Sequence, residues 1–118
     1  LEALRQGRYH EAITAYESLL QVGPDFIETL MGLARAYHAS HQPNPAIEYA
    51  TRTIQRCALP EAYFIVASSF LMKGDKKRAL AWLDVSLQGG FRERQRIEEY
   101  FSTLKNDPAY VALLRRPS

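Results

Sequence analysis

Alanines recur along this chain at a nearly constant spacing. Ala12, Ala46 and Ala79 are 34 and 33 residues apart, and Ala34 and Ala67 are 33 residues apart. A period of this length is typical of arrays in which each repeat is a single supersecondary unit. Small side chains recur where the two helices of a hairpin cross, because they let the backbones approach closely. The period therefore predicts an all-α chain of stacked helix-turn-helix units.

Glycine, proline and capping residues divide the chain into predicted helices. Within each segment apolar residues recur at three- and four-residue steps, which is the stripe of a core-facing helix. We expect helices over residues 9–22, 26–40, 43–57, 60–72, 76–87, 92–104 and 109–115, with residues 1–6 ending an earlier one. Asp25 and Glu28 form a D-x-x-E arrangement that is predicted to cap the helix over 26–40. Asp75 is predicted to cap the helix over 76–87, and no segment reads as a strand.

Two stretches repeat one another around the alanine columns. Leu30-x-x-Leu33-Ala34-x-x-Tyr37 precedes Ala46, and Tyr63-x-x-Val66-Ala67-x-x-Phe70 precedes Ala79. Together with the period, this pattern resembles the tetratricopeptide repeat family over about residues 1–90. The tryptophan column of that family holds Leu30 and Tyr63 here, and Phe91 stands where a repeat-ending proline is usual. The resemblance implies a right-handed superhelix of antiparallel helix-turn-helix repeats.

The resemblance also implies how a single domain of residues 1–118 is organised. Residues 1–26 would be a partial repeat, 27–59 and 60–90 whole repeats, and 91–118 a degenerate repeat with capping helices. In the last unit Phe101 fills the small-residue column, so its hairpin is expected to pack less closely. That suits an end cap, which covers the last repeat and presents a polar outer face. The tail from Asp107 to Leu114 resembles endings seen after bacterial tetratricopeptide regions.

In tetratricopeptide proteins the first helices of successive units line a concave groove that holds a peptide or a partner helix. Carried over by column, the expected groove residues are Met31, Arg35, His38, Phe64, Ser68, Leu71, Met72 and Glu98. The apolar members among them are not needed inside their own hairpins, and an exposed apolar strip usually marks a contact. The alternative is that the C-terminal helix folds back and covers them.

These features favour a protein–protein interaction module or scaffold that binds a partner protein and is not an enzyme. One alternative is a nucleic-acid-binding helical repeat of similar length, although apolar groove columns count against it. A regulatory segment of a larger enzyme is compatible with the first interpretation. Neither the partner nor the oligomeric state follows from the sequence, and no cofactor is expected.

Chemistry-bearing motifs are missing from the sequence. It contains no phosphate-binding G-x-x-x-x-G-K, no G-x-S-x-G and no H-E-x-x-H. His38 and His41 are expected to be a solvent-facing pair without a third ligand, so no metal site is predicted. Cys57, the single cysteine, excludes an internal disulfide and is expected to fill a small buried or half-buried space.

Charge and hydropathy set further bounds. A net charge of +2 is too mild to indicate nucleic-acid binding, and the longest apolar-rich run is too short to span a bilayer. No basic region followed by an apolar one reads as a signal peptide in this segment, which is expected to be a trimmed piece of a longer chain. The compartment stays open, with the cytoplasm favoured. Arg92, Arg94 and Arg96 lie near a predicted helix start, where positive charge is unfavourable. They are expected either to be solvated or to pair with acids or a partner.

Overall fold

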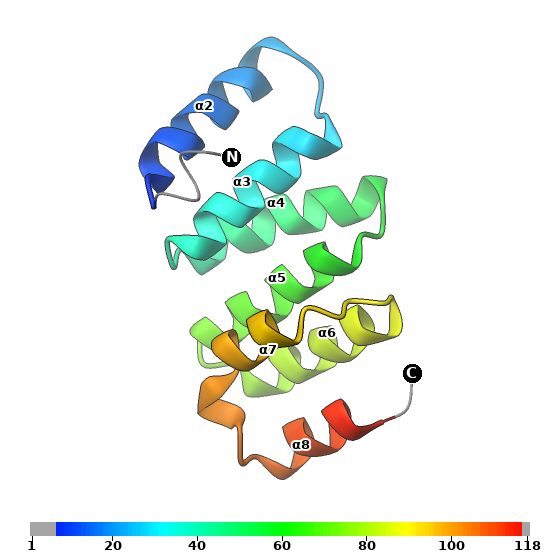
Figure 1. Ribbon diagram of the computed structural model, residues 1–118. Coiled ribbons are helices and arrows are strands. Elements are labelled where there is room, and N and C mark those ends of the chain that lie inside the picture. The colour runs from blue at the N-terminus through cyan, green and yellow to red at the C-terminus, as the bar shows by residue number, and fades with distance from the viewer. Residues whose placement is uncertain (1–6, 117–118) are drawn as a thin grey trace.

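The computed structural model describes residues 7–116, and every regular element in that range is a helix (Figure 1). The elements are α2 (Tyr9–Val22), α3 (Ile27–Ala39), α4 (Pro43–Arg56), α5 (Pro60–Met72), α6 (Lys76–Gln88), α7 (Arg94–Tyr100), the 3-10 helix η1 (Ser102–Leu104) and α8 (Pro108–Arg115). The all-α helical repeat that the sequence predicts is confirmed. The helix end expected over residues 1–6 lies outside the described residues.

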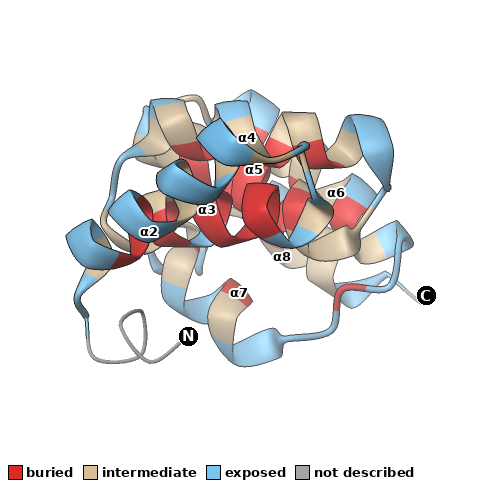
Figure 2. Ribbon diagram, turned by 90° about the horizontal axis from the view of Figure 1, so that it is seen from above, coloured by how far each residue is buried: buried red, intermediate tan, exposed pale blue. Residues whose placement is uncertain are grey.

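Consecutive helices from α2 to α6 pack antiparallel on one another in an elongated stack. Together with the C-terminal helices, the molecule measures 46 × 26 × 23 Å. The most extensive packing is within the hairpin α5–α6, followed by the hairpin α3–α4. Ala34 and Ala46 of one hairpin, and Ala67 and Ala79 of the other, have no exposed surface. Buried residues gather on the helix faces that meet (Figure 2). The alanine columns are therefore buried in both hairpins, as their recurrence predicts.

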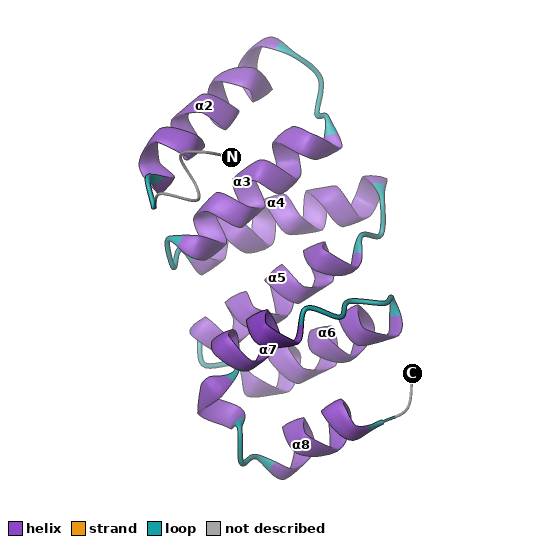
Figure 3. Cartoon of the chain, in the orientation of Figure 1, coloured by secondary structure: helices purple, strands orange, loops and turns teal. Residues whose placement is uncertain are grey.

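The tight turns also keep the period (Figure 3). Gly7 before α2 and Gly74 between α5 and α6 have φ angles of 75° and 81°, in the left-handed region that favours glycine. His41 takes the corresponding place between α3 and α4 with φ 61°, so a histidine here adopts a conformation costly for most side chains. Asp75 caps α6 as predicted, since its carboxylate accepts the Arg78 backbone N–H at 3.1 Å.

The capping arrangement predicted for Asp25 and Glu28 is wrong. Helix α3 begins after Phe26, and no side chain caps its free N–H groups. The Asp25 carboxylate instead accepts a hydrogen bond of 2.8 Å from Arg52 of α4. It therefore links the entrance of α3 to the helix that packs against it.

The helix predicted over residues 92–104 is shorter than expected. α7 ends at Tyr100, Phe101 leaves helical geometry at φ −107° and ψ 22°, and η1 follows. The Phe101 side chain is completely buried in the cluster formed by α5, α6 and α8. A bulky ring in the small-residue column thus coincides with the point where the regular repeat geometry stops.

Among residues 7–116, no helix is both long and apolar enough to cross a membrane.

Candidate functional site

Phe64 of α5, the central residue of the predicted apolar strip, is completely buried. The Phe91 ring stacks on it at 4.6 Å between centroids and an angle of 15°. Tyr100 meets the same ring edge-on at 6.0 Å, and Phe101 lies at 6.2 Å. The expectation that Phe64 is exposed is therefore wrong, because α7 and the segment before it cover this face of α5.

Met31 of α3 is buried as well, with 2% of its surface exposed. It belongs to the cluster between α3, α4 and α5, together with Ala34, Ala46, Ala62 and Ile65. Its side chain therefore packs in the junction between the two hairpins and not on an open groove. The groove position that the resemblance implied for Met31 is therefore wrong.

His38 and Ser68, both expected in the groove, form a buried pair between α3 and α5. His38 is 2% exposed and Ser68 1% exposed, and the imidazole Nε2 is hydrogen-bonded to the serine Oγ. The serine hydroxyl donates to the Phe64 carbonyl at 3.1 Å. The predicted solvent-facing pair of His38 and His41 is thus wrong, since only His41 is exposed.

Aromatic rings complete the enclosure of His38. Tyr100 of α7 stacks on the imidazole at 4.3 Å, and Phe64 meets it edge-on at 6.0 Å. Burial, and secondarily the positive charges of Arg96 and His41, lowers the pKa of His38 from 6.5 to about 3, although Glu61 opposes the shift. The neutral imidazole is therefore the form that this packing requires.

The folded state is expected to lose about 2 kcal/mol of stability through His38 between pH 7 and pH 5. In the unfolded chain His38 binds a proton below its ordinary pKa of 6.5, whereas the folded protein keeps it neutral down to about pH 3. The unfolded state therefore binds more protons in this window, and the free energy of unfolding falls as the pH falls. Urea denaturation at several pH values measures this slope.

The matched variants for this test are His38→Gln, which removes the titrating group, and His10→Gln, which replaces an exposed histidine. His38→Gln should flatten the slope between pH 7 and pH 5, whatever its effect on absolute stability, and His10→Gln should leave the slope as it is. An equal slope in all three proteins would contradict the burial of a neutral His38.

Arg35 is the one cationic residue expected in the groove, and it is exposed. Its guanidinium binds the Glu61 carboxylate of α5 through Nε at 2.9 Å and Nη2 at 2.6 Å. Arg96 of α7 reaches the same carboxylate at 3.1 Å and lies over the Phe64 ring at 5.2 Å from its centroid. Burial acts to raise the pKa of Glu61, but these two arginines outweigh it and hold the pKa below its usual value. The cluster thus ties three helices together at one carboxylate.

The remaining expected groove residues do not lie on one surface. Leu71 is half-buried against the Phe64 cluster, and Met72 is half-buried at the end of α5. Glu98 is exposed on α7, where Arg94 donates to it at 3.4 Å. It lines a hollow with Lys105 and Tyr110, next to α8. The structure therefore brings His38, Phe64 and Ser68 together as core, and leaves Arg35 and Glu98 exposed on different helices.

Residues 3–56 match the family described as Tetratricopeptide repeat. This stretch is a tetratricopeptide repeat region. Tetratricopeptide repeats generally mediate protein–protein interaction and act as scaffolds. The match ends in α4, and the hairpin α5–α6 continues the stack beyond it. No curated protein matches the chain.

Within this tetratricopeptide region and the helices that follow, the described residues contain no group of three or more His, Cys, Asp or Glu that could hold a metal ion. Cys57 is exposed at the end of α4, so the expectation of a buried or half-buried filler is wrong. Its backbone N–H closes α4 on the Thr53 carbonyl while the thiol faces outward. Position near a helix end did not indicate burial in this case.

Phe91, Tyr100 and Arg96 cover the face of α5 on which Phe64 was expected to be exposed, and the resemblance did not assign them to it. A signal for them is present in the sequence. Phe91 stands where a repeat-ending proline is usual, and Tyr100 and Phe101 place two further rings in the last unit. Together they supply the apolar surface that covers Phe64. The alternative interpretation, in which the C-terminal helix folds back over the expected groove residues, allowed for such a cover.

Proposed function

We propose that the chain is a protein–protein interaction module that holds a peptide or a helix of a partner and carries out no reaction itself. The observation that carries this proposal is the tetratricopeptide match over residues 3–56, in a stack whose next hairpin repeats the same geometry. The two whole repeats of the proposal are residues 27–59 and 60–90, and residues 91–118 cap them.

The partner contacts exposed side chains beside α7, because the middle of the groove side is filled by the chain itself. Arg35 is the best placed of these, since 45% of its side chain is exposed. Its Nη1 makes no hydrogen bond to any residue that the structure describes. A guanidinium fixed on one side by Glu61 is oriented for a second acceptor from a partner. Met72 lies at the C-terminal end of α5, whereas Glu61 lies at its start, and it adds apolar surface.

Capture of partners from cell extract on the immobilised chain, followed by titration of the purified partner, tests this function. Arg35→Glu is expected to weaken the purified complex about tenfold, which corresponds to the loss of one charge-assisted hydrogen bond. Arg56→Glu is the matched control, because Arg56 is exposed on α4 and forms no ion pair within residues 7–116. Its effect should be small.

Two results would overturn the proposal. One is that no protein is retained by the folded chain at any salt concentration. The other is that single-stranded RNA binds tightly and with the steep salt dependence of phosphate contacts, which would favour the nucleic-acid alternative.

A further inference from the structure

The last two helices do not close as the other hairpins do. Helices α3 and α4 pack closely, and so do α5 and α6, whereas α8 makes its main helix contact with α6 and not with α7. Phe101, which fills the small-residue column, lies between them with its ring stacked on Tyr110 at 5.8 Å. Helices α7 and α8 are therefore splayed apart, and they meet through side chains without a close approach of their backbones.

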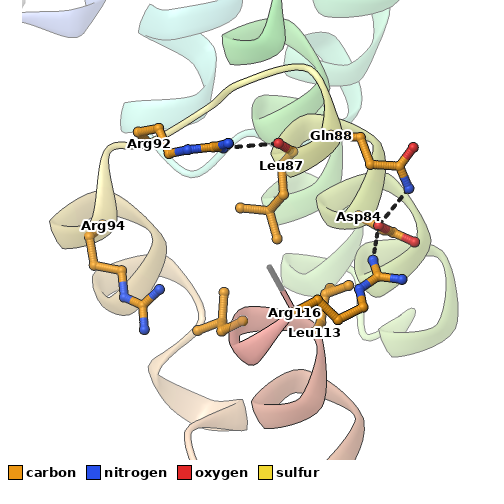
Figure 4. A pocket seen from close by; sticks show the side chains of 8 residues that line it. Asp84, Leu87, Gln88, Arg92, Arg94, Leu113 and Arg116 are labelled. Atoms are coloured by element: carbon orange, nitrogen blue, oxygen red, sulfur yellow. Dashed lines mark hydrogen bonds and ion pairs between the residues drawn. The ribbon is translucent and has the colours of Figure 1, made fainter. Parts of the chain in front are cut away.

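The splayed unit contains two adjoining hollows of about 390 and 410 Å³, which we call the cap cleft. The first is lined by Asp84, Leu87, Gln88, Arg92, Arg94, Leu113, Leu114 and Arg116 (Figure 4). The second is lined by Arg94, Glu98, Ser102, Lys105, Tyr110, Val111, Leu114 and Arg115. Arg94 and Leu114 line both hollows, so the cleft runs past them. Its floor is apolar and its rim is charged.

Positive charge dominates the rim, with five basic side chains against two acidic ones. Both acids are already bound: Arg116 and Gln88 donate to Asp84, and Arg94 donates to Glu98. Among residues 7–116, the other three bases of the rim have no acidic partner at ion-pair distance, namely Arg92, Lys105 and Arg115. The cleft therefore has cationic capacity that the chain itself does not use.

The arginines of the first hollow are held in place. Arg92 donates through Nη1 to the Leu87 carbonyl at 2.9 Å and to the Phe91 carbonyl at 3.0 Å. Its Nε and Nη2 have no partner among the described residues. In Figure 4, Arg92 and Arg94 lie on one side of the opening and Arg116 with Asp84 on the other, while Leu87 points into the space between them. An occupant would meet an apolar floor between two cationic edges.

We propose that the cap cleft binds an acidic segment of a partner protein, with an apolar side chain on the leucine floor and flanking carboxylates on the arginines. Guanidinium groups match carboxylates through paired N–H donors, and an anchored guanidinium loses little freedom on binding. Each hollow has the volume of a few side chains and not of a whole helix. The two hollows adjoin past Arg94, so an internal segment fits better than a chain terminus. The cleft is separate from the Arg35 side of the stack, so this proposal does not depend on the function proposed above.

The test uses the full chain labelled with nitrogen-15 and a short glutamate–leucine peptide that is acetylated and amidated. Titration should shift the backbone signals of residues that line the cap cleft. A peptide with glutamine in place of glutamate, and one with serine in place of leucine, should each bind at least about tenfold more weakly, since each lacks one half of the match. A version with a free terminal carboxylate should bind no more tightly than the blocked one.

Arg94→Glu and Arg115→Glu are each expected to weaken the glutamate–leucine peptide about tenfold. Both side chains are exposed, and the Arg94–Glu98 pair adds little stability, so the variants should fold. Lys77→Glu, which makes the same charge change at an exposed site outside the cleft, should leave binding unchanged. Absence of shifts at millimolar peptide, shifts confined to α3 and α5, or displacement of the peptide by single-stranded RNA would overturn the proposal. The first of these would leave the groove-side function untouched, the second would support it, and the third would favour the nucleic-acid alternative.

Discussion

Phe64→Ala is expected to lower the free energy of unfolding by about 3–5 kcal/mol. The side chain is completely buried, and three rings from the cap pack on it: Phe91, Tyr100 and Phe101. Removing the phenyl ring leaves a cavity at the point where α5 meets the cap, and Arg96 loses the ring that lies under it. Denaturant titration followed by circular dichroism measures the loss.

Phe26→Ala is the matched control, because Phe26 is 56% exposed before α3. It should change the free energy of unfolding by no more than about 0.5 kcal/mol, as surface substitutions usually do. If Phe64→Ala kept full stability and weakened a partner instead, Phe64 would be open in solution and α7 would not cover it.

Ala67→Trp is expected to cost at least about 3 kcal/mol and to unfold the hairpin α5–α6. Ala67 has no exposed surface and lies in one buried cluster with Ala79 and Leu83 of the partner helix. An indole at this crossing cannot enter unless the two helices separate, and their packing is the most extensive in the stack. The midpoint of thermal unfolding and the helical circular dichroism signal report the change.

Ala81→Trp introduces the same side chain at an exposed position of α6. It costs only the small difference in helix propensity between alanine and tryptophan, a few tenths of a kcal/mol. Equal stability of the two variants would show that α5 and α6 do not approach closely at Ala67.

The fold could be predicted because its determinants are local and repeated. An alanine every 33 or 34 residues, with glycine and proline between helices, constrains each hairpin separately and in the same way. Even the turn at His41 keeps its place without a glycine. Asp25 shows where local reasoning fails. Its carboxylate was predicted to cap the helix that follows it, but Arg52 of a neighbouring helix binds it instead.

The groove was harder to predict, since it depends on where a distant helix lies. Arg35 is exposed, because an arginine there needs only its own helix to point outward. Phe64 and His38 are different, since their burial depends on rings far along the chain: Phe91 follows Phe64 by 27 positions, and Tyr100 follows His38 by 62. A spacing within one hairpin carries no information about whether a cap will turn onto its face. The same holds for the cap cleft, which lies in the unit where Phe101 fills the small-residue column.

The stacking of Tyr100 on His38 has a consequence for how the chain unfolds. In a linear array each unit touches only its neighbours, so end units can unfold one at a time. Tyr100 belongs to the cap, yet it contacts α3, which lies two hairpins back along the chain. Unfolding of the α3–α4 hairpin therefore removes support from the cap directly, and loss of the cap exposes both hairpins at once. The repeats should behave as one cooperative unit and not as a row of independent ones.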